Sequence, residues 1–220
     1  MDCCWAISVA TVIGYLYHTE TLNPNFELSS QDILDRVWLY YNENVRDKQR
    51  DKAGCYCCNV DIGFKYVQEH GVGYSKDYPF DAALNEKKDY VDPKTEYPRV
   101  YTGEPEKFTK IEDVIMSLKE KKRALIGVVR VTPELCHYKK EDGIYRHPTA
   151  GSPNKVGLGK HAVVIVGVNE EEGYLIIRNS WGPGWGDGGY GRVAYGAFAG
   201  SFTAPTSAFE LQYPLNLDNV

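Results

Sequence analysis

The chain has 220 residues, of which 43% are hydrophobic and 25% charged, a composition typical of a globular protein with a substantial core. Its net charge of −5 gives no indication of nucleic-acid binding, and no apolar stretch approaches the roughly 18 residues that span a bilayer. We therefore expect neither nucleic acid nor a membrane as a partner.

The first half of the sequence is expected to be mainly helical. Residues 5–17 are mostly apolar, which predicts a buried helix, and Ser29 begins a capping sequence that precedes apolar residues at helical spacing. A later helix is expected to end at Gly71, because glycine is common just after helices. The predicted helices of this half cover residues 5–17, 33–41 and 60–70, with a polar loop at 42–54 and an extended segment at 74–80.

The second half of the sequence favours strands. One more helix is predicted at 111–118, and apolar, β-branched runs follow it. The predicted strands cover residues 125–131, 161–168, 173–179, 189–195 and 209–215, with a long surface loop between 147 and 160. Helices followed by strands predict an α+β protein, a single domain 1–220 with a helical subdomain (about 1–108) and a β-rich subdomain (about 109–220).

Six cysteines stand at positions 3, 4, 55, 57, 58 and 136. The crowded group Cys55 to Cys58 could bind zinc, but no second Cys or His pair at zinc spacing accompanies it. A disulfide in this loop is the favoured interpretation, with a connectivity that the sequence leaves open. We expect no bound metal.

Cys4 stands at the start of the first predicted helix. The positive end of the helix dipole favours a thiolate there, which could attack a carbonyl if a histidine lay beside it. His161 opens a predicted strand and Asn179 ends another. Taken singly, these residues could be a buried thiol, a core histidine and a strand-ending asparagine. Together they are the parts of a nucleophilic triad, and their distribution predicts a cleft between the two subdomains.

Three blocks of sequence contain these residues: Cys4–Ser8, Lys160–Gly167 and Arg178–Gly191. They resemble the nucleophile, histidine and asparagine boxes of the papain-like cysteine peptidases, the family of papain and the cathepsins. Weaker similarities occur at 28–35, 58–59 and 74–80, in the family's order. The resemblance implies a papain-like fold of two subdomains with the cleft between them, in which the second half is an antiparallel, β-barrel-like sheet.

The resemblance also implies a role for each residue of the site. Cys4 is the expected nucleophile, which forms a thioester intermediate with the substrate. His161 is the expected acid and base, and Asn179 orients its ring. Trp5 and Trp181 support the site, and Trp181 covers the hydrogen bond between His161 and Asn179. The expected reaction is hydrolysis of peptide bonds, with no metal or organic cofactor.

By the same resemblance, seven residues are expected to bind substrate: Asn59, Val60, Asp61, Ile62, Gly63, Val128 and Ala162. Val60 and Asp61 replace two glycines that the family usually has, so their side chains should crowd the peptide. The expected pocket walls favour an apolar side chain two residues before the scissile bond. The floor of that pocket could be Ser207 or Glu210. Lys160 stands where relatives often have Asp or Asn.

Two departures concern the start of the chain. The family's second oxyanion donor is a glutamine six residues before the nucleophile, a position that lies before Met1, so we expect an N-terminally truncated or divergent member with weakened activity. The usual partner of Cys58 in a family disulfide would fall at Met1, so that bridge is not expected in its usual form.

The expected partners are peptide or protein substrates and proteinaceous inhibitors or a pro-segment, bound by a monomer. The resemblance implies a vacuolar, lysosomal or extracellular location, although the chain has no visible secretory signal. The main alternative is a weak or inactive homologue that binds peptides or a protein partner in the same cleft. A third hypothesis is a related acyl transferase such as a transpeptidase.

Overall fold

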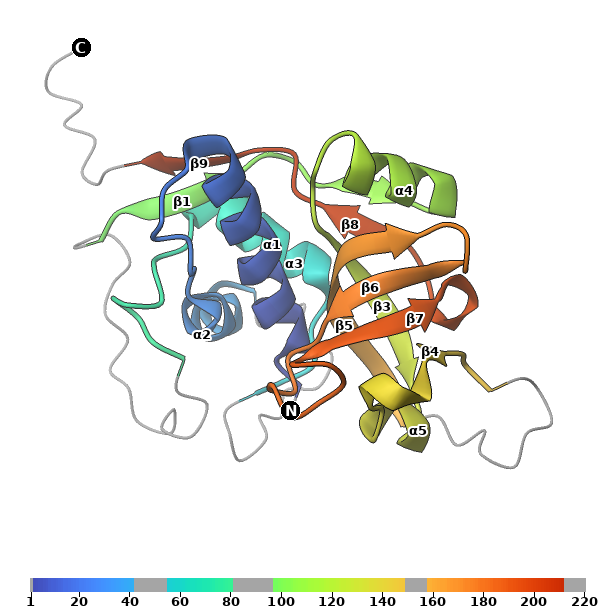
Figure 1. The fold of residues 1–220 in the computed structure, drawn as a ribbon. Helices are drawn as coiled ribbons and strands as arrows, with labels where there is room; N and C mark the ends of the chain where they lie inside the picture. The colour runs from blue at the N-terminus through green and yellow to red at the C-terminus, as the bar shows by residue number, and fades with distance from the viewer. Residues whose placement is uncertain (1, 42–54, 81–96, 149–157, 212–220) are drawn as a thin grey trace, which may run out of the picture. The chain divides into compact units, whose positions relative to one another are not determined.

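The computed structural model describes residues 2–41, 55–80, 97–148 and 158–211. The chain divides into two compact units, Met1–Pro105 together with Pro205–Val220, and Glu106–Ala204. Three helices dominate the first unit and a large sheet the second (Figure 1). The expected α+β class is therefore confirmed.

In its described residues, the first unit contains the helices α1 (Cys4–Thr21), α2 (Ser30–Tyr40) and α3 (Val60–His70). Helix α1 is buried over most of its length because apolar residues occur on nearly all of its faces. Gly14 is required in it, since a Cβ there would lie 2.3 Å from the carbonyl oxygen of Phe26. All three predicted helices are confirmed, and α1 extends four residues beyond its predicted end at residue 17. The predicted loop at 42–54 lies outside the described residues.

Helices α2 and α3 both begin at a side-chain cap. The Ser29 hydroxyl accepts a hydrogen bond from the N–H of Asp32 at 2.9 Å, and the Asn59 side chain accepts one from the N–H of Asp61 at 3.2 Å. Gly71 ends α3 with a positive φ of 67°, which glycine adopts without strain. These capping and terminating residues explain why both helices could be predicted from the sequence.

A buried cluster of charges connects α2 to the strand β1. The Asp32 carboxylate accepts hydrogen bonds from the guanidinium groups of Arg36 and Arg99, and from the N–H of Gly73 at 2.8 Å. Arg99 also donates to the hydroxyl of Tyr66 at 2.6 Å. The three charged side chains are buried, and buried charges are tolerated only when they are paired and hydrogen-bonded. The cluster therefore fixes α2, α3 and β1 against one another.

The first unit also contains a two-stranded antiparallel sheet, formed by β1 (Arg99–Thr102) and β9 (Ala208–Leu211). The strand expected at 209–215 thus belongs to the first unit and pairs with β1, not with the sheet of the second half; its residues beyond 211 lie outside the described residues. On β9, the carboxylate of Glu210 accepts hydrogen bonds from the hydroxyls of Tyr17 and Tyr74. These contacts hold β9 in place, although the two tyrosines are far from Glu210 in the sequence. The four residues of β9 alone therefore do not predict where the strand lies.

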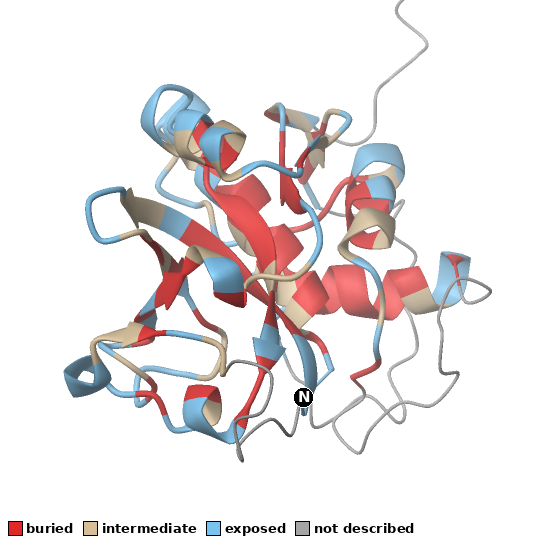
Figure 2. Ribbon diagram, turned by 90° about the vertical axis from the view of Figure 1, so that its right-hand side faces the viewer, coloured by how far each residue is buried: buried red, intermediate tan, exposed pale blue. Residues whose placement is uncertain are grey.

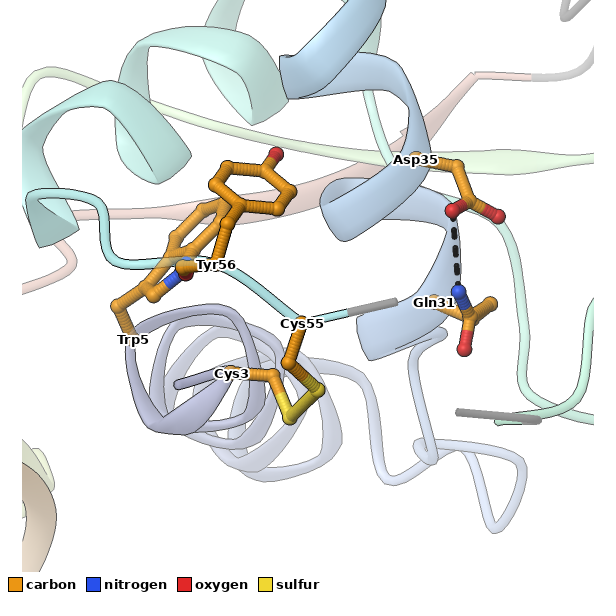
Figure 3. Close-up of a disulfide and its surroundings, with 6 residues drawn as sticks. All are labelled: Cys3, Trp5, Gln31, Asp35, Cys55 and Tyr56. Carbon is orange, nitrogen blue, oxygen red and sulfur yellow. Dashed lines mark hydrogen bonds between the residues drawn. A yellow bond between two sulfur atoms is a disulfide. The ribbon is translucent and has the colours of Figure 1, made fainter. Parts of the chain in front are cut away.

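A disulfide joins Cys3 to Cys55, 52 residues apart in the sequence, with Cα atoms separated by 5.1 Å (Figure 3). Beside it the Trp5 indole N–H donates to the carbonyl of Tyr56 at 2.8 Å, and the Tyr56 hydroxyl donates to the carbonyl of Leu34 at 2.5 Å. The favoured interpretation of these cysteines, a disulfide, is confirmed. The bridge attaches the start of α1 to the segment that leads into α3.

The second unit is built on a mixed sheet of seven strands in the order β2-β8-β3-β5-β6-β7-β4. Neighbouring strands are antiparallel except for β4 and β7, which are parallel. Because β2 and β4 lie at its two edges, the described sheet is open, which corrects the expected antiparallel, barrel-like arrangement. The strands are β2 (Glu106–Phe108), β3 (Leu125–Val131), β4 (Ile144–Tyr145), β5 (Gly159–Asn169), β6 (Tyr174–Arg178), β7 (Tyr190–Ala194) and β8 (Phe202–Ala204).

Alternating apolar residues of the sheet form the core of the second unit, and Figure 2 shows buried residues along the strands with exposed ones at the turns. Helix α4 (Ile111–Lys119) contributes Val114 to this core, and the short helix α5 (Pro133–Cys136) contributes Leu135. Short 3₁₀ helices occur at Lys140–Asp142, after α5, and at Tyr195–Ala197, after the strand β7. The sequence predicted α4 and the long strands but not α5, β1, β2, β4 or β8, which have only two to four residues each.

We predict that removing the disulfide destabilises the first unit. The bridge closes a loop over a separation of 52 residues and so restricts the unfolded chain. This restriction raises the free energy of unfolding by about 4 kcal/mol. The double variant Cys3→Ala/Cys55→Ala should therefore unfold at a clearly lower urea concentration, measured by circular dichroism. Cys136→Ala is the matched control, since it removes a half-buried thiol outside the bridge. Equal unfolding midpoints for the native chain and the double variant would contradict this prediction.

Candidate active site

Cys4 is the first residue of α1 and is half-buried. The dipole and the first-turn N–H groups of the helix favour the thiolate at this position. The residues on either side of it are both fixed, Cys3 by the disulfide and Trp5 by its hydrogen bond to Tyr56. The thiol therefore lies on a backbone that is held from two directions.

His161 and Asn179 meet in the second unit. His161 lies near the start of β5, and Asn179 comes directly after β6. The ring Nε2 of His161 lies 2.7 Å from the side-chain oxygen Oδ1 of Asn179, and both residues are buried. The same Oδ1 accepts a hydrogen bond from the backbone N–H of Ser180 at 2.8 Å.

The contact with Ser180 determines the tautomer of His161. A backbone N–H can only donate, so the Asn179 atom that it meets is the oxygen, and Nε2 of His161 must then carry the proton. In the neutral ring this leaves the lone pair on Nδ1, which makes no hydrogen bond within the described part of the chain. His161 is thus oriented as a base whose reactive nitrogen is Nδ1.

The indole of Trp181 covers this pair. It stacks on the His161 ring with centroids 4.6 Å apart and an angle of 24° between the planes. Burial of His161 lowers its pKa, because it disfavours the charged imidazolium, whereas the hydrogen bond to Asn179 acts in the opposite direction. The pKa of His161 is therefore below its ordinary value in this environment, and Asn179 limits the decrease.

The loop after Asn179 is held firmly in place. The backbone N–H of Asn179 donates to the carbonyl of Gly189 at 2.9 Å, and the Trp185 indole donates to the carbonyl of Leu135 at 2.8 Å. At Gly186, a Cβ would lie 2.1 Å from the carbonyl oxygen of Tyr190, so only glycine fits. The loop from Asn179 to Gly189 therefore forms a rigid support for Trp181 and Asn179.

The expected substrate-binding residues of the first unit lie at the start of α3. Asn59 is exposed, whereas Val60, Asp61 and Ile62 are partly buried in the first turn. Gly63 is buried, and a Cβ on it would lie 3.3 Å from the Trp5 ring. Gly63 thus permits the close packing of α3 on α1, which places these residues near the tryptophan that follows Cys4.

The expected substrate-binding residues of the second unit are neighbours in the sheet. Val128 on β3 lies directly opposite Ala162 on β5, and the adjacent pair is Val129 and His161. The two expected wall residues are therefore next to the histidine along the same pair of strands.

The two candidates for the pocket floor, Ser207 and Glu210, are both hydrogen-bonded in the first unit. The Ser207 hydroxyl accepts a hydrogen bond from the N–H of Gly103 at 3.1 Å. The Glu210 carboxylate is bound by the two tyrosine hydroxyls described above. Both side chains are therefore held by contacts within the first unit.

A cavity of about 370 Å³ lies beside Trp181 in the second unit. The residues that line it are Cys136, Lys139, Trp181, Gly184 and Trp185. The Lys139 ammonium donates to the carbonyl of Gly184 at 2.9 Å. The sequence did not assign a role to Cys136 or Lys139, because α5 and the turn after it have no recognisable pattern.

Other thiols differ from Cys4 in their surroundings. Burial raises the pKa of Cys58 to about 11, so this thiol is protonated at neutral pH.

Among the described residues, no three His, Cys, Asp or Glu side chains are grouped as a metal site. No helix in the described ranges is long and apolar enough to cross a membrane.

Comparison with known proteins agrees with this geometry. A sequence model described as papain family cysteine protease matches residues 2–205. Cathepsin L 2 of Paramecium tetraurelia is 32% identical over 206 residues, which are 92% of this chain and 56% of the relative. The cysteine protease of Blomia tropicalis is 27% identical over 202 residues, or 88% and 55% of the two chains. This chain thus spans a little over half the length of these curated relatives.

The fold is also similar to that of a solved structure. The cysteine protease CMS1MS2 of Carica candamarcensis, solved in complex with E-64, has a TM-score of 0.69 and 23% sequence identity. The match covers 94% of this chain and 89% of that one. The expected papain-like fold is therefore confirmed.

We predict that the residue at position 179 controls the pKa of His161. Asn179→Leu has a similar shape but no acceptor for Nε2–H, so it should lower the pKa of His161 further. Asn179→Asp adds a negative charge, which favours the imidazolium and should raise the pKa. NMR titration of the His161 ring measures both changes, with Asn169→Leu, on the same sheet, as the control. An unchanged pKa of His161 in both position-179 variants would contradict this prediction.

Proposed function

The chain belongs to the papain family of cysteine proteases, and we propose that it hydrolyses peptide bonds with Cys4 as the nucleophile. The observation that carries this proposal is the buried hydrogen bond between His161 and Asn179, which leaves Nδ1 as the basic nitrogen. A histidine held in this way can take the proton of a thiol. Cys4, at the start of α1, is the thiol best prepared to lose one.

In the proposed reaction, Nδ1 of His161 takes the proton from the Cys4 thiol. The thiolate attacks the peptide carbonyl carbon, and the imidazolium then gives its proton to the leaving amine. The resulting thioester is attacked by water, which His161 deprotonates, and release of the carboxylic acid restores the thiol. The backbone N–H of Cys4 is proposed as one donor to the oxyanion. Asn179 and Trp181 keep the ring oriented and shielded throughout.

We propose peptide or protein substrates with an apolar side chain two residues before the scissile bond. Val128 and Ala162 would form one wall of the pocket and Ile62 another. The apolar side chains of Val128, Ala162 and Ile62 support this preference. Proteinaceous inhibitors or a pro-segment are further proposed partners of a monomeric enzyme.

A lysosomal, vacuolar or extracellular setting is part of the proposal. The similarity to cathepsin L 2 of Paramecium tetraurelia supports such a location. The disulfide between Cys3 and Cys55 also supports it, because disulfides persist in oxidising compartments.

A peptidyl epoxide such as E-64 tests the proposed nucleophile. We predict that the native chain is labelled once, at Cys4, and that labelling and peptide hydrolysis are both lost in Cys4→Ala. Cys136→Ala, which removes a different half-buried thiol, should be labelled normally. Mass spectrometry of the digested protein identifies the modified residue. If the folded native chain binds peptides but is neither labelled nor able to cleave them, the chain is an inactive homologue instead.

A further inference from the structure

Two cations face each other at one end of the central strands of the second unit. Arg130 on β3 lies directly opposite Lys160 on β5. Both are exposed, and neither is ion-paired within the described part of the chain. By contrast, Lys119, Arg123 and Lys140 of the same unit each pair with a carboxylate. Because like charges directly opposite each other destabilise a sheet, an anionic ligand would relieve an unfavourable arrangement.

The position of this pair follows from the alternation of side chains along the strands. Val129, Val163 and Ile165 face the core, so Lys160 and Ala162 lie together on the other face, with Arg130 and Val128 opposite them. Successive pairs on one face are about 7 Å apart along the strand. The basic pair is thus one step beyond the wall formed by Val128 and Ala162.

In the proposed binding mode, an extended substrate runs along this face of the two strands, from Val128 and Ala162 towards Arg130 and Lys160. The proposed function places the side chain two residues before the scissile bond at Val128 and Ala162. An extended peptide that continues in this direction advances about 3.3 Å per residue. Two residues further on, the first residue after the scissile bond therefore reaches Arg130 and Lys160.

We propose that Arg130 and Lys160 select substrates with an acidic side chain in the first position after the scissile bond. This inference rests on the proposed function and names a substrate class for the same site. Asp or Glu at that position would lie between two cations. Exposed ion pairs are individually weak, so each cation should favour an acidic side chain by about two- to fivefold.

The test compares three peptides that differ only in the residue after the scissile bond, which is Asp, Asn or Lys, all with the same apolar residue two positions before it. For the native chain we expect kcat/KM to be about four- to 25-fold higher for Asp than for Asn, and lowest for Lys. The preference for Asp over Asn should fall towards 1 in Arg130→Gln/Lys160→Gln and reverse in Arg130→Glu/Lys160→Glu. Added salt should reduce it in the native chain.

Arg192→Gln is the matched control, since it removes an exposed cation from β7 of the same sheet. It should keep the native preference. Equal rates for the Asp and Asn peptides in the native chain, or the same preference in every variant, would overturn the proposal.

Peptide affinity separates this proposal from the proposed function. Fluorescence anisotropy with Cys4→Ala measures binding of the uncleaved Asp and Asn peptides. Tighter binding of the Asp peptide that depends on Arg130 and Lys160 supports the basic pair even if no chain cleaves any peptide. Equal affinities for the two peptides would contradict it even if the native chain is an active peptidase.

Discussion

The hydrogen bond from His161 to Asn179 is effective because the fold excludes water from it. Both residues are buried, and Trp181 stacks on the histidine ring. Strand β5 supplies the histidine, and the Asn179 backbone is fixed by the carbonyl of Gly189. The N–H of Ser180 then decides which atom of the amide faces the ring. In a low-dielectric environment this contact sets the tautomer and orientation of the proposed catalytic base, and it limits the decrease in pKa that burial causes.

The first unit holds the Cys4 thiol at the start of a helix. Helix ends fray easily, and Cys3 provides no side-chain cap to prevent it. The disulfide to Cys55, the hydrogen bond of Trp5 and the close packing at Gly63 provide the missing restraint. The buried Asp32 cluster then connects the neighbouring helices to β1. Stability and the placement of Cys4 thus depend on the same local contacts.

The sequence predicted those parts of the molecule that have a strong local pattern. The bounds of α3 and β3 are the predicted ones. Asn59 caps the start of the helix and Gly71 ends it, and a run rich in β-branched residues forms the strand. Through the resemblance to the family's histidine and asparagine boxes, the sequence also predicted the contact between His161 and Asn179. The partner of β9, the partner of Cys3 and the tautomer of His161 all depend on contacts between distant residues. Such contacts have no local pattern from which to predict them.

The reactivity of Cys4 as a function of pH tests most directly whether Cys4 and His161, from different units, act as a pair. Iodoacetamide alkylates only the thiolate, and mass spectrometry follows each cysteine separately. If the pair exists, Cys4 of the native chain is alkylated rapidly well below the ordinary thiol pKa of about 8.5, and His161→Ala shifts its profile towards that value. Cys58, whose pKa is raised to about 11 by burial, serves as the internal reference. An ordinary Cys4 profile that is identical in both proteins would contradict the pairing.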